Sequence, residues 1–385
     1  MRTMRGGSYI APCRPRRGPS AGSSINVRVF ARTSWRAQAA AAVAAAAALL
    51  AVTQALADKP LTPLQGPTAT TITAIAIDFD RDRPGRKEFG KLIFRAGLNL
   101  YAKTSQFGGY SALAIDPSGR SLLAISDAGS WLRATLDYDG RRLKGLSDAV
   151  VGPILGVDGK PLRDDAMRDS EGMALIGGDT RQGTALVSFE RKHRIARYPF
   201  TLDRFGPPTG TVPLPAGAKG MVANRGIEAM ASIKAGKLKR TLLAFAEGRA
   251  DKNGNLIGWL IGGPTPGGIL LKRIGGFDVT DMAALPDGGV VLLERRFRFS
   301  EGIKMRIRRI AASEIRRGAL IQGEVLLDAN DSLNIDNMEA IAAHRAPSGE
   351  TVLTLMSDDN FSALQRTLIM QFTLPEKPVI AGPRG

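Results

Sequence analysis

The sequence contains few of the side chains on which many metal and redox sites depend. Of its 385 residues, one is a cysteine (Cys13) and two are histidines (His193 and His344). A single cysteine cannot form an intramolecular disulfide, and it excludes a zinc site built on several thiolates. Two histidines likewise exclude an imidazole-rich metal centre. Any cation site in this protein must therefore be built mainly from oxygen ligands.

Acidic residues and lysine are absent from the first 57 residues. This segment contains eight arginines and so carries +8 of the formal net charge of +17. After Arg36 comes an alanine-rich apolar stretch that ends in Ala55-Leu56-Ala57. A basic start, an apolar middle and a small-x-small end predict a secretory signal peptide over residues 1–57, cleaved after Ala57. A membrane anchor is the alternative, which the weak hydrophobicity of alanine and the polar Gln38 and Gln54 disfavour.

Removal of this leader would leave residues 58–385, which contain no cysteine. A cysteine-free chain fits a periplasmic or extracellular protein that folds without disulfides. The positive charge that remains is moderate, and its Lys and Arg residues are not interleaved with aromatic residues. We therefore expect no nucleic-acid partner and no stable membrane insertion after cleavage. The sequence gives no indication of the oligomeric state.

Five segments after the leader follow one plan. Each opens on a short polar or acidic residue, continues as an apolar run, turns at Gly or polar residues and ends a second apolar run on an acid. The opening residues are Ser111, Glu171, Glu228, Asp281 and Glu339, spaced 60, 57, 53 and 58 residues apart. The closing residues are Asp127, Glu190, Glu247, Glu294 and Asp358. Self-similarity at a nearly fixed period is typical of a repeat architecture.

The repeats predict an all-β fold, a β-propeller. Their apolar runs are short and are separated by turn sequences such as PSG and LPDGG, which are typical of hairpins. About four strands per repeat fit a propeller blade, whereas a two-domain β-sandwich would leave the repeat unexplained. We count five visible four-stranded repeats, with five or six blades in all.

The two ends of the predicted domain complete one blade. The fifth repeat lacks an outer strand, and residues 90–100 are expected to supply it, so that pairing of N- and C-terminal strands closes the ring. Residues 71–79 remain as an extra strand that would belong to a sixth blade if one exists. Residues 58–69 are then a lead-in, residues 70–375 one domain and residues 376–385 a tail.

The opening and closing residues predict the functional site. In an antiparallel hairpin, the start of the first strand and the end of the second lie at the same end of the sheet. If the first strand of each blade lines a central channel, all ten residues gather at one mouth, and nine of them are carboxylates. Oxygen ligands favour a hard cation, Ca²⁺ before Mg²⁺. The candidate ligands are Asp127, Glu171, Glu228, Glu339 and Asp358.

Basic residues beside these acids suggest a phosphate substrate. Arg191, Arg225 and Arg295 neighbour the acids in sequence, and guanidinium groups bind phosphate oxygens in a bidentate way. Asp281 or Glu294 would orient the attacking water. The alternative is that the acids and arginines form only a belt of ion pairs that fixes the closure of the ring.

Around the same residues the sequence resembles a known family. The segments DSEGMA, FERKHRI, NRGIEAMA, DMAALPDGG, LLERRF, NMEAIA and LMSDDN, with FGGYSALAID and SDAG before them, resemble the phytase-like, "esterase-like activity of phytase" domain of exported bacterial proteins. The resemblance covers roughly residues 90–375. It implies a β-propeller whose acidic residues hydrolyse phosphoesters with calcium. The matching acids are Asp127, Glu171, Glu228, Asp281, Glu294, Glu339 and Asp358, and Ser111 leaves the ring incomplete in the first repeat.

The sequence thus predicts a secreted, calcium-dependent hydrolase of a small-molecule phosphate ester. Two other functions remain open. One is a non-catalytic propeller that binds an anionic ligand or a protein partner. The other is a calcium-dependent lactonase or carboxylic ester hydrolase, a chemistry that a ring of acids at a propeller mouth also supports.

Overall fold

The computed structural model describes residues 64–218, 220–223 and 225–375. The predicted leader (1–57), the first part of the lead-in and the tail (376–385) lie outside the described residues. Regular structure in the described part is almost entirely β-strand, apart from α2 (Asp165–Arg168) and the short 3₁₀ helix η1 (Ala216–Ala218). No helix among these residues is long and apolar enough to cross a membrane.

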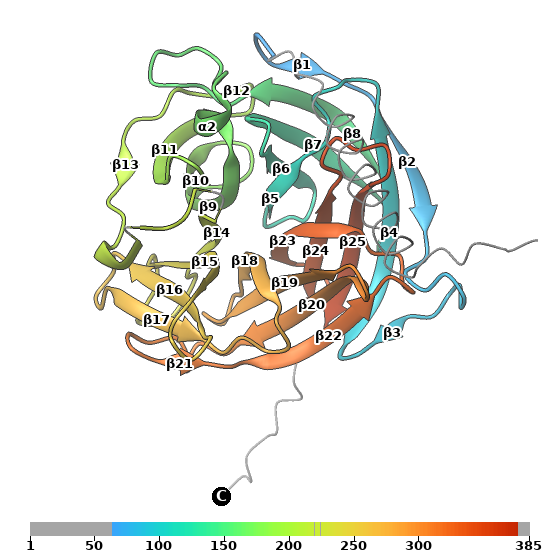
Figure 1. The fold of residues 1–385 in the computed structure, drawn as a ribbon. Helices are drawn as coiled ribbons and strands as arrows, with labels where there is room; N and C mark the ends of the chain where they lie inside the picture. The colour runs from blue at the N-terminus through green and yellow to red at the C-terminus, as the bar shows by residue number, and fades with distance from the viewer. Residues whose placement is uncertain (1–63, 219, 224, 376–385) are drawn as a thin grey trace, which may run out of the picture. The chain divides into compact units, whose positions relative to one another are not determined.

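Five sheets follow one another along the chain and surround a common centre (Figure 1). Blade 1 contains β5 (Tyr110–Ile115), β6 (Ser121–Ser126), β7 (Ser130–Asp139), β8 (Arg142–Pro153) and β1 (Thr68–Ala69). Blade 2 contains β9 (Ser170–Gly178), β10 (Gly183–Phe189), β11 (Arg194–Thr201), β12 (Arg204–Phe205) and β13 (Thr211–Val212). Blade 3 contains β14 (Ile227–Ser232), β15 (Leu242–Ala250), β16 (Leu256–Ile261), β17 (Gly267–Leu271) and β21 (Leu320–Ile321).

The remaining strands form two more blades. Blade 4 contains β18 (Asp278–Ala284), β19 (Val290–Arg298), β20 (Gly302–Ile310) and β22 (Glu324–Asn330). Blade 5 contains β23 (Asn337–Arg345), β24 (Thr351–Asp358), β25 (Thr367–Leu374), β4 (Leu92–Ala102), β2 (Ile72–Ile77) and β3 (Glu88–Phe89). The first strands of the blades contact one another in the order β5, β9, β14, β18 and β23, and β23 contacts β5 again. The predicted β-propeller is confirmed, with five blades.

Blade 5 is built from both ends of the described chain. β4 pairs antiparallel with β25, with Leu100 opposite Thr367 and Ile93 opposite Thr373. The predicted closure by N- and C-terminal strands is therefore confirmed. β2, the strand expected at residues 71–79, pairs with β4 at the outer side of the same sheet. It extends blade 5, and residues 64–375, as far as the structure describes them, form no sixth blade.

One predicted strand is divided between two blades. The sequence favours a single strand over residues 320–327, but Gly323 has a φ of 68° and interrupts it. β21 before the glycine pairs in parallel with β17 of blade 3, whereas β22 after it pairs with β20 of blade 4. A backbone in the left-handed region breaks an extended strand, and glycine adopts it without steric cost. The short β21 thus joins the neighbouring sheet.

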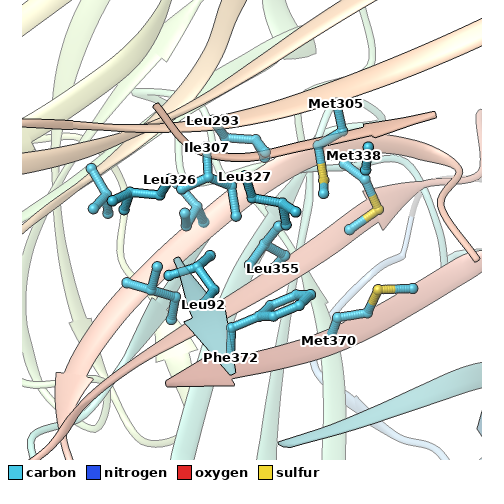
Figure 2. Close-up of a cluster of buried hydrophobic side chains, with 14 of the residues drawn as sticks. Leu92, Leu293, Met305, Ile307, Leu326, Leu327, Met338, Leu355, Met370 and Phe372 are labelled. Atoms are coloured by element: carbon cyan, nitrogen blue, oxygen red, sulfur yellow. The ribbon is translucent and has the colours of Figure 1, made fainter. Parts of the chain in front are cut away.

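The core lies between the blades. Figure 2 shows the cluster between blades 4 and 5, where Leu92 of β4 lies close to Phe372 of β25. The rings of Phe94 and Phe372 are 5.5 Å apart, and that of Phe79 is 5.1 Å from Phe372. Side chains on both faces of each sheet are buried against neighbouring blades, and β25 is buried along its whole length. The blades therefore form a rigid frame that fixes the strand ends at each mouth of the channel.

Candidate active site at the carboxylate mouth

A β-bulge near the start of each first strand places one side chain per blade at the mouth. In blade 3, Ile227 pairs with Ala246 but Ala229 already pairs with Phe245, so Glu228 is the extra residue. The residues at this bulge in the five blades are Ser111, Glu171, Glu228, Thr280 and Glu339. A bulge twists the strand locally and re-aims its side chain, which is why bulges are frequent beside active sites.

The second strand of each blade adds a side chain at the same end. In each blade, the residue just before the bulge pairs with a residue of the second strand, and the next residue along that second strand lies at the mouth. These next residues are Asp127, Glu190, Glu247, Arg295 and Asp358. Four blades thus contribute a carboxylate here, and blade 4 contributes a guanidinium. The mouth is rich in carboxylates, and Arg295 of blade 4 adds a cation among them.

In the fourth repeat, the bulge lies one residue earlier than the position of the opening acid in the sequence pattern. Val279 pairs with Glu294, so Thr280 and Arg295 occupy the mouth positions that the repeat pattern predicts for Asp281 and Glu294. The Asp281 carboxylate is buried and accepts hydrogen bonds of 2.8 Å from the backbone N–H groups of Met282 and Ile341, the latter in blade 5. A shift of one residue places a side chain on the opposite face of a strand. Asp281 therefore joins blades 4 and 5 through these hydrogen bonds, and the charge of Glu339 at the mouth still acts on it.

Glu294 is also bound away from the mouth. Its side chain is fully buried and pairs with the equally buried Arg308 of β20. Arg308 also donates to the carbonyl oxygens of Lys272 at 2.9 Å and Gln322 at 2.8 Å, which lie at the ends of β17 and β21 in blade 3. Glu294 and Arg308 thus tie blade 4 to blade 3. Asp281 and Glu294 are thus both engaged in contacts within the frame of the blades, and their role in orienting a water molecule stays a prediction.

Blades 2 and 3 bring together two groups of three carboxylates. In each group, one oxygen atom from every carboxylate lies within 4.8 Å of the other two. The groups are Asp169, Glu171 and Glu190, and Glu190, Glu228 and Glu247. Glu190 belongs to both, so that five carboxylates form one continuous cluster. Oxygen-only donors at these separations fit Ca²⁺ or Mg²⁺.

Sequence reasoning named Glu171 and Glu228 as ligands but missed Asp169. This residue lies between α2 and β9, two positions before Glu171, in the segment RDSEG. Glu190 and Glu247 were recognised as closing residues, yet they were not chosen as ligands. The available signal was the density of acids in repeats two and three, where both strands supply a glutamate.

Burial makes the four glutamates of this cluster hard to ionise without a partner, since it raises the pKa of each. Burial, together with the charges of Glu190 and Asp169, raises the pKa of Glu171 well above its usual value. Burial raises the pKa of Glu190 to about 7, although the backbone N–H of Gly226, 2.8 Å from Oε1, opposes the shift. The pKa of Glu228 is also raised well above its usual value by burial and by the charge of Glu247. A bound cation would relieve this repulsion.

Gly172 allows the close approach of blades 2 and 3 on which the cluster depends. A Cβ atom at residue 172 would lie 2.1 Å from the carbonyl oxygen of Glu228. Because no side chain fits in this space, only glycine lets β9 and β14 come so close at the level of the bulges. Glu171 and Glu228 are consequently held side by side.

The predicted basic residues surround the cluster. Arg295 Nη2 lies 2.9 Å from Glu339 Oε1, and Arg191 Nε lies 2.6 Å from Asp169 Oδ2. Burial alone would lower the pKa of Arg295, but the charges of Glu339 and Glu228 outweigh it and raise this pKa. Arg225 lies beside Gly248, next to Glu247. All three arginines are thus at the mouth.

Asp127, Glu339 and Asp358 occupy the other side of the mouth, in blades 1 and 5. Neither carboxylate triad includes them. Burial, followed by the charge of Asp169, raises the pKa of Asp127 to about 7. Burial and the charge of Asp127 raise the pKa of Asp358 well above its usual value, although Asp358 accepts a hydrogen bond of 2.6 Å from the Asn360 backbone. The structure therefore separates the predicted ligands into a compact cluster and a flanking group.

Comparison with known proteins identifies a family. No curated protein matches the chain. One similar solved structure is the β-propeller domain of Myceliophteria thermophila Cps50 (Swd1), which is 11% identical in sequence. The match covers 81% of this chain and 100% of that chain, with a TM-score of 0.33. Another is a protein of unknown function from Dyadobacter fermentans DSM 18053, with 12% identity, 82% and 96% covered and a TM-score of 0.35. At these scores neither likeness carries a functional argument.

The family assignment comes from the sequence of the propeller itself. A model described as "Phytase-like: Esterase-like activity of phytase" matches residues 105–361. These residues include all five bulges and the whole carboxylate cluster. The chain belongs to the phytase-like family, esterase-like activity of phytase.

Proposed function

We propose that the protein is a calcium-dependent hydrolase of a small-molecule phosphate ester, acting in the periplasm or outside the cell. Membership of the phytase-like family supports a hydrolase-like propeller at a coarse level. The observation that carries the finer proposal is the pair of carboxylate triads sharing Glu190, with the guanidinium of Arg295 beside them. Carboxylates for a hard cation and a guanidinium for an anion are what phosphoester chemistry requires.

Asp169, Glu171, Glu190, Glu228 and Glu247 would hold the cation. When bound, Ca²⁺ would offset the carboxylate charge and polarise a phosphate oxygen. The donor set fits such an ion because every side chain in it offers oxygen and because burial makes the uncompensated charges costly. The cluster is thus better explained as a cation site than as a belt of ion pairs.

Arg295 is the group that would bind the phosphate. It reaches the mouth from β19, and the ion pair of 2.9 Å with Glu339 fixes its guanidinium. Hydrogen bonds from a guanidinium to phosphate oxygens would hold the phosphorus atom over the carboxylate cluster. Arg191 and Arg225 at the rim add positive charge, which attracts an anionic substrate.

Glu339 is our candidate for the group that orients the attacking water, in place of Asp281 and Glu294. It lies at the mouth but outside both triads. Burial raises its pKa and Arg295 opposes the shift, so Glu339 is a stronger base than an exposed glutamate. The water oxygen would form a bond to phosphorus while Glu339 accepts its proton. The ester P–O bond would break, and the leaving alkoxide would take up the proton that Glu339 had accepted, which returns Glu339 to its ionised form.

Calorimetry with Ca²⁺ and phosphate release from a panel of monoesters and diesters test the proposal. The Glu190→Gln variant removes a charge from both triads and should abolish both Ca²⁺ binding and turnover. Asp287→Asn is the matched control, because Asp287 is half exposed at the β18–β19 turn, away from the mouth. We expect the control to bind and turn over like the wild type.

The same experiment separates the alternatives. Saturable Ca²⁺ binding without any product would indicate a binding propeller. Turnover of lactones or carboxylic esters with no phosphate release would indicate the other ester chemistry. Absence of Ca²⁺ binding, or wild-type behaviour of Glu190→Gln, would refute the proposed site.

A further inference from the structure

A cavity adjoins the carboxylate mouth on the side of blades 3 and 4. It has a volume of about 400 Å³, and its lining includes Glu247 and Arg295, which also belong to the mouth. The other lining residues are Arg273, Gly276, Asp278, Thr280, Arg296, Phe297 and Arg298. Because the cavity and the mouth share two side chains, a molecule whose phosphate lies at Arg295 would place its remaining atoms in this cavity.

The polar wall of the cavity contains hydrogen-bond donors without acceptors. Among the described residues, Arg295 Nε and Arg296 Nε are buried and have no hydrogen-bond partner. Leaving a buried donor unpaired costs roughly 1–3 kcal/mol, more for a charged group. The lining contains four guanidinium groups and two carboxylates. Each guanidinium is paired with a carboxylate: Arg273 with Asp278, Arg295 with Glu339, and both Arg296 and Arg298 with Glu301. The wall therefore offers planar guanidinium groups that ion pairs hold in place, rather than uncompensated positive charge.

The outer lip of the cavity is aromatic. Phe297 lines the cavity although 64% of its surface is exposed, and Phe299, two residues further along the β19–β20 hairpin, is 87% exposed. Exposed phenylalanines beside a cavity forgo the free energy of burial, which suggests that a ligand covers them. Guanidinium planes also stack on aromatic rings, so the arginines and Phe297 favour the same kind of flat group.

We propose that the alcohol part of the substrate carries a planar aromatic ring and that this cavity binds it. The inference rests on the proposed function and names the substrate class of that site. The phosphate would bind at Arg295, and the ring would lie between Phe297 and the guanidinium groups of the wall. A saturated ring of similar size contacts Phe297 but does not stack on a guanidinium, so it should bind more weakly.

Three phosphonates that are not hydrolysed test this inference with the full chain in the presence of Ca²⁺. Benzylphosphonate and cyclohexylmethylphosphonate have the same charge and similar apolar area, and methylphosphonate lacks a ring. By calorimetry, benzylphosphonate should bind about 3- to 10-fold more tightly than cyclohexylmethylphosphonate. Phe297→Leu should remove this difference and leave the affinity for methylphosphonate unchanged. Leu364→Ala, at an exposed position in the β24–β25 turn, is the matched control and should keep it.

The outcomes distinguish the two proposals. If methylphosphonate binds and the benzyl and cyclohexylmethyl compounds have equal affinity, the aromatic subsite is refuted and the phosphate site stands. A preference for benzylphosphonate that survives Phe297→Leu also refutes the subsite. If no phosphonate binds with Ca²⁺ present, both the proposed function and this inference fail.

Discussion

The buried pair of Glu294 and Arg308 offers the sharpest test of how the fourth blade is built. Arg308→Met would leave the fully buried Glu294 without its cation, while Met fills much of the same volume. Breaking a buried ion pair by removing one partner costs about 3–5 kcal/mol. At roughly 2 °C per kcal/mol for a large domain, Tm should fall by about 6–10 °C. The double variant Glu294→Leu/Arg308→Met, which buries no charge, should recover the part of the loss that is due to the unpaired carboxylate, while the carbonyl oxygens of Lys272 and Gln322 still lack their donor.

Thermal unfolding followed by circular dichroism measures this effect, and calorimetry with Ca²⁺ on the same samples measures the site. Both residues belong to blade 4, where Arg308 contacts blade 3, and neither is part of the carboxylate cluster, so both variants should bind Ca²⁺ as the wild type does. Glu294→Gln supplies the decisive comparison. If it weakens Ca²⁺ binding and leaves Tm unchanged, Glu294 faces the mouth, and the one-residue shift of the fourth blade is wrong.

Three further predictions concern the mouth. Arg295→Gln should weaken methylphosphonate binding by about 10- to 100-fold, because a charge-assisted hydrogen bond is lost. The same variant should strengthen Ca²⁺ binding. Calorimetry with each ligand in parallel measures both affinities, and a fall in both would contradict this prediction. The pKa values of Asp127 and Glu190 are about 7 in the folded protein and near 4 in the unfolded chain. Between these values the folded form binds more protons than the unfolded form. Without divalent cations, the free energy of unfolding should therefore fall as pH rises from about 4 to 7. Thermal unfolding in EDTA and in CaCl₂ checks this, since Ca²⁺ should reduce the fall. Gly172→Ala should lower stability by about 1–3 kcal/mol in urea unfolding and weaken Ca²⁺ binding, whereas Gly177→Ala, with open space around its Cβ, should do neither.

The fold could be predicted from the sequence because its repeats are regular. The spacing of the opening residues gave the blade count to within one, and the missing strand in the fifth repeat indicated the closure. Residues 71–79 were ambiguous because an outer strand of blade 5 and a strand of a sixth blade have the same local pattern. Only the pairing of β2 with β4 separates the two cases.

The site could be predicted only in part, because a bulge changes which side chain faces the mouth. The segment DVTDMAAL offers two acids around Thr280, and pattern matching chose Asp281 by its resemblance to Glu228 and Glu339. The pairing of Val279 with Glu294 makes Thr280 the bulged residue instead. Register is normally read from the alternation of apolar and polar residues along a strand. Where the neighbouring residues are small, or are buried on both faces of the sheet, this alternation is lost, and a shift of one residue leaves no trace in the sequence.

The pairing of β4 with β25 also constrains how the chain is made. β4 is among the first strands to be synthesised and β25 is the last of the described strands, so β4 keeps an unpaired edge until almost the whole domain has been translated. An exposed strand edge can pair with another chain, and pairing across so long a separation is slow. A nascent or truncated chain that ends before Thr367 therefore presents the unpaired backbone edge of β4. We expect such chains to aggregate or to need a chaperone, even though the other four blades are complete.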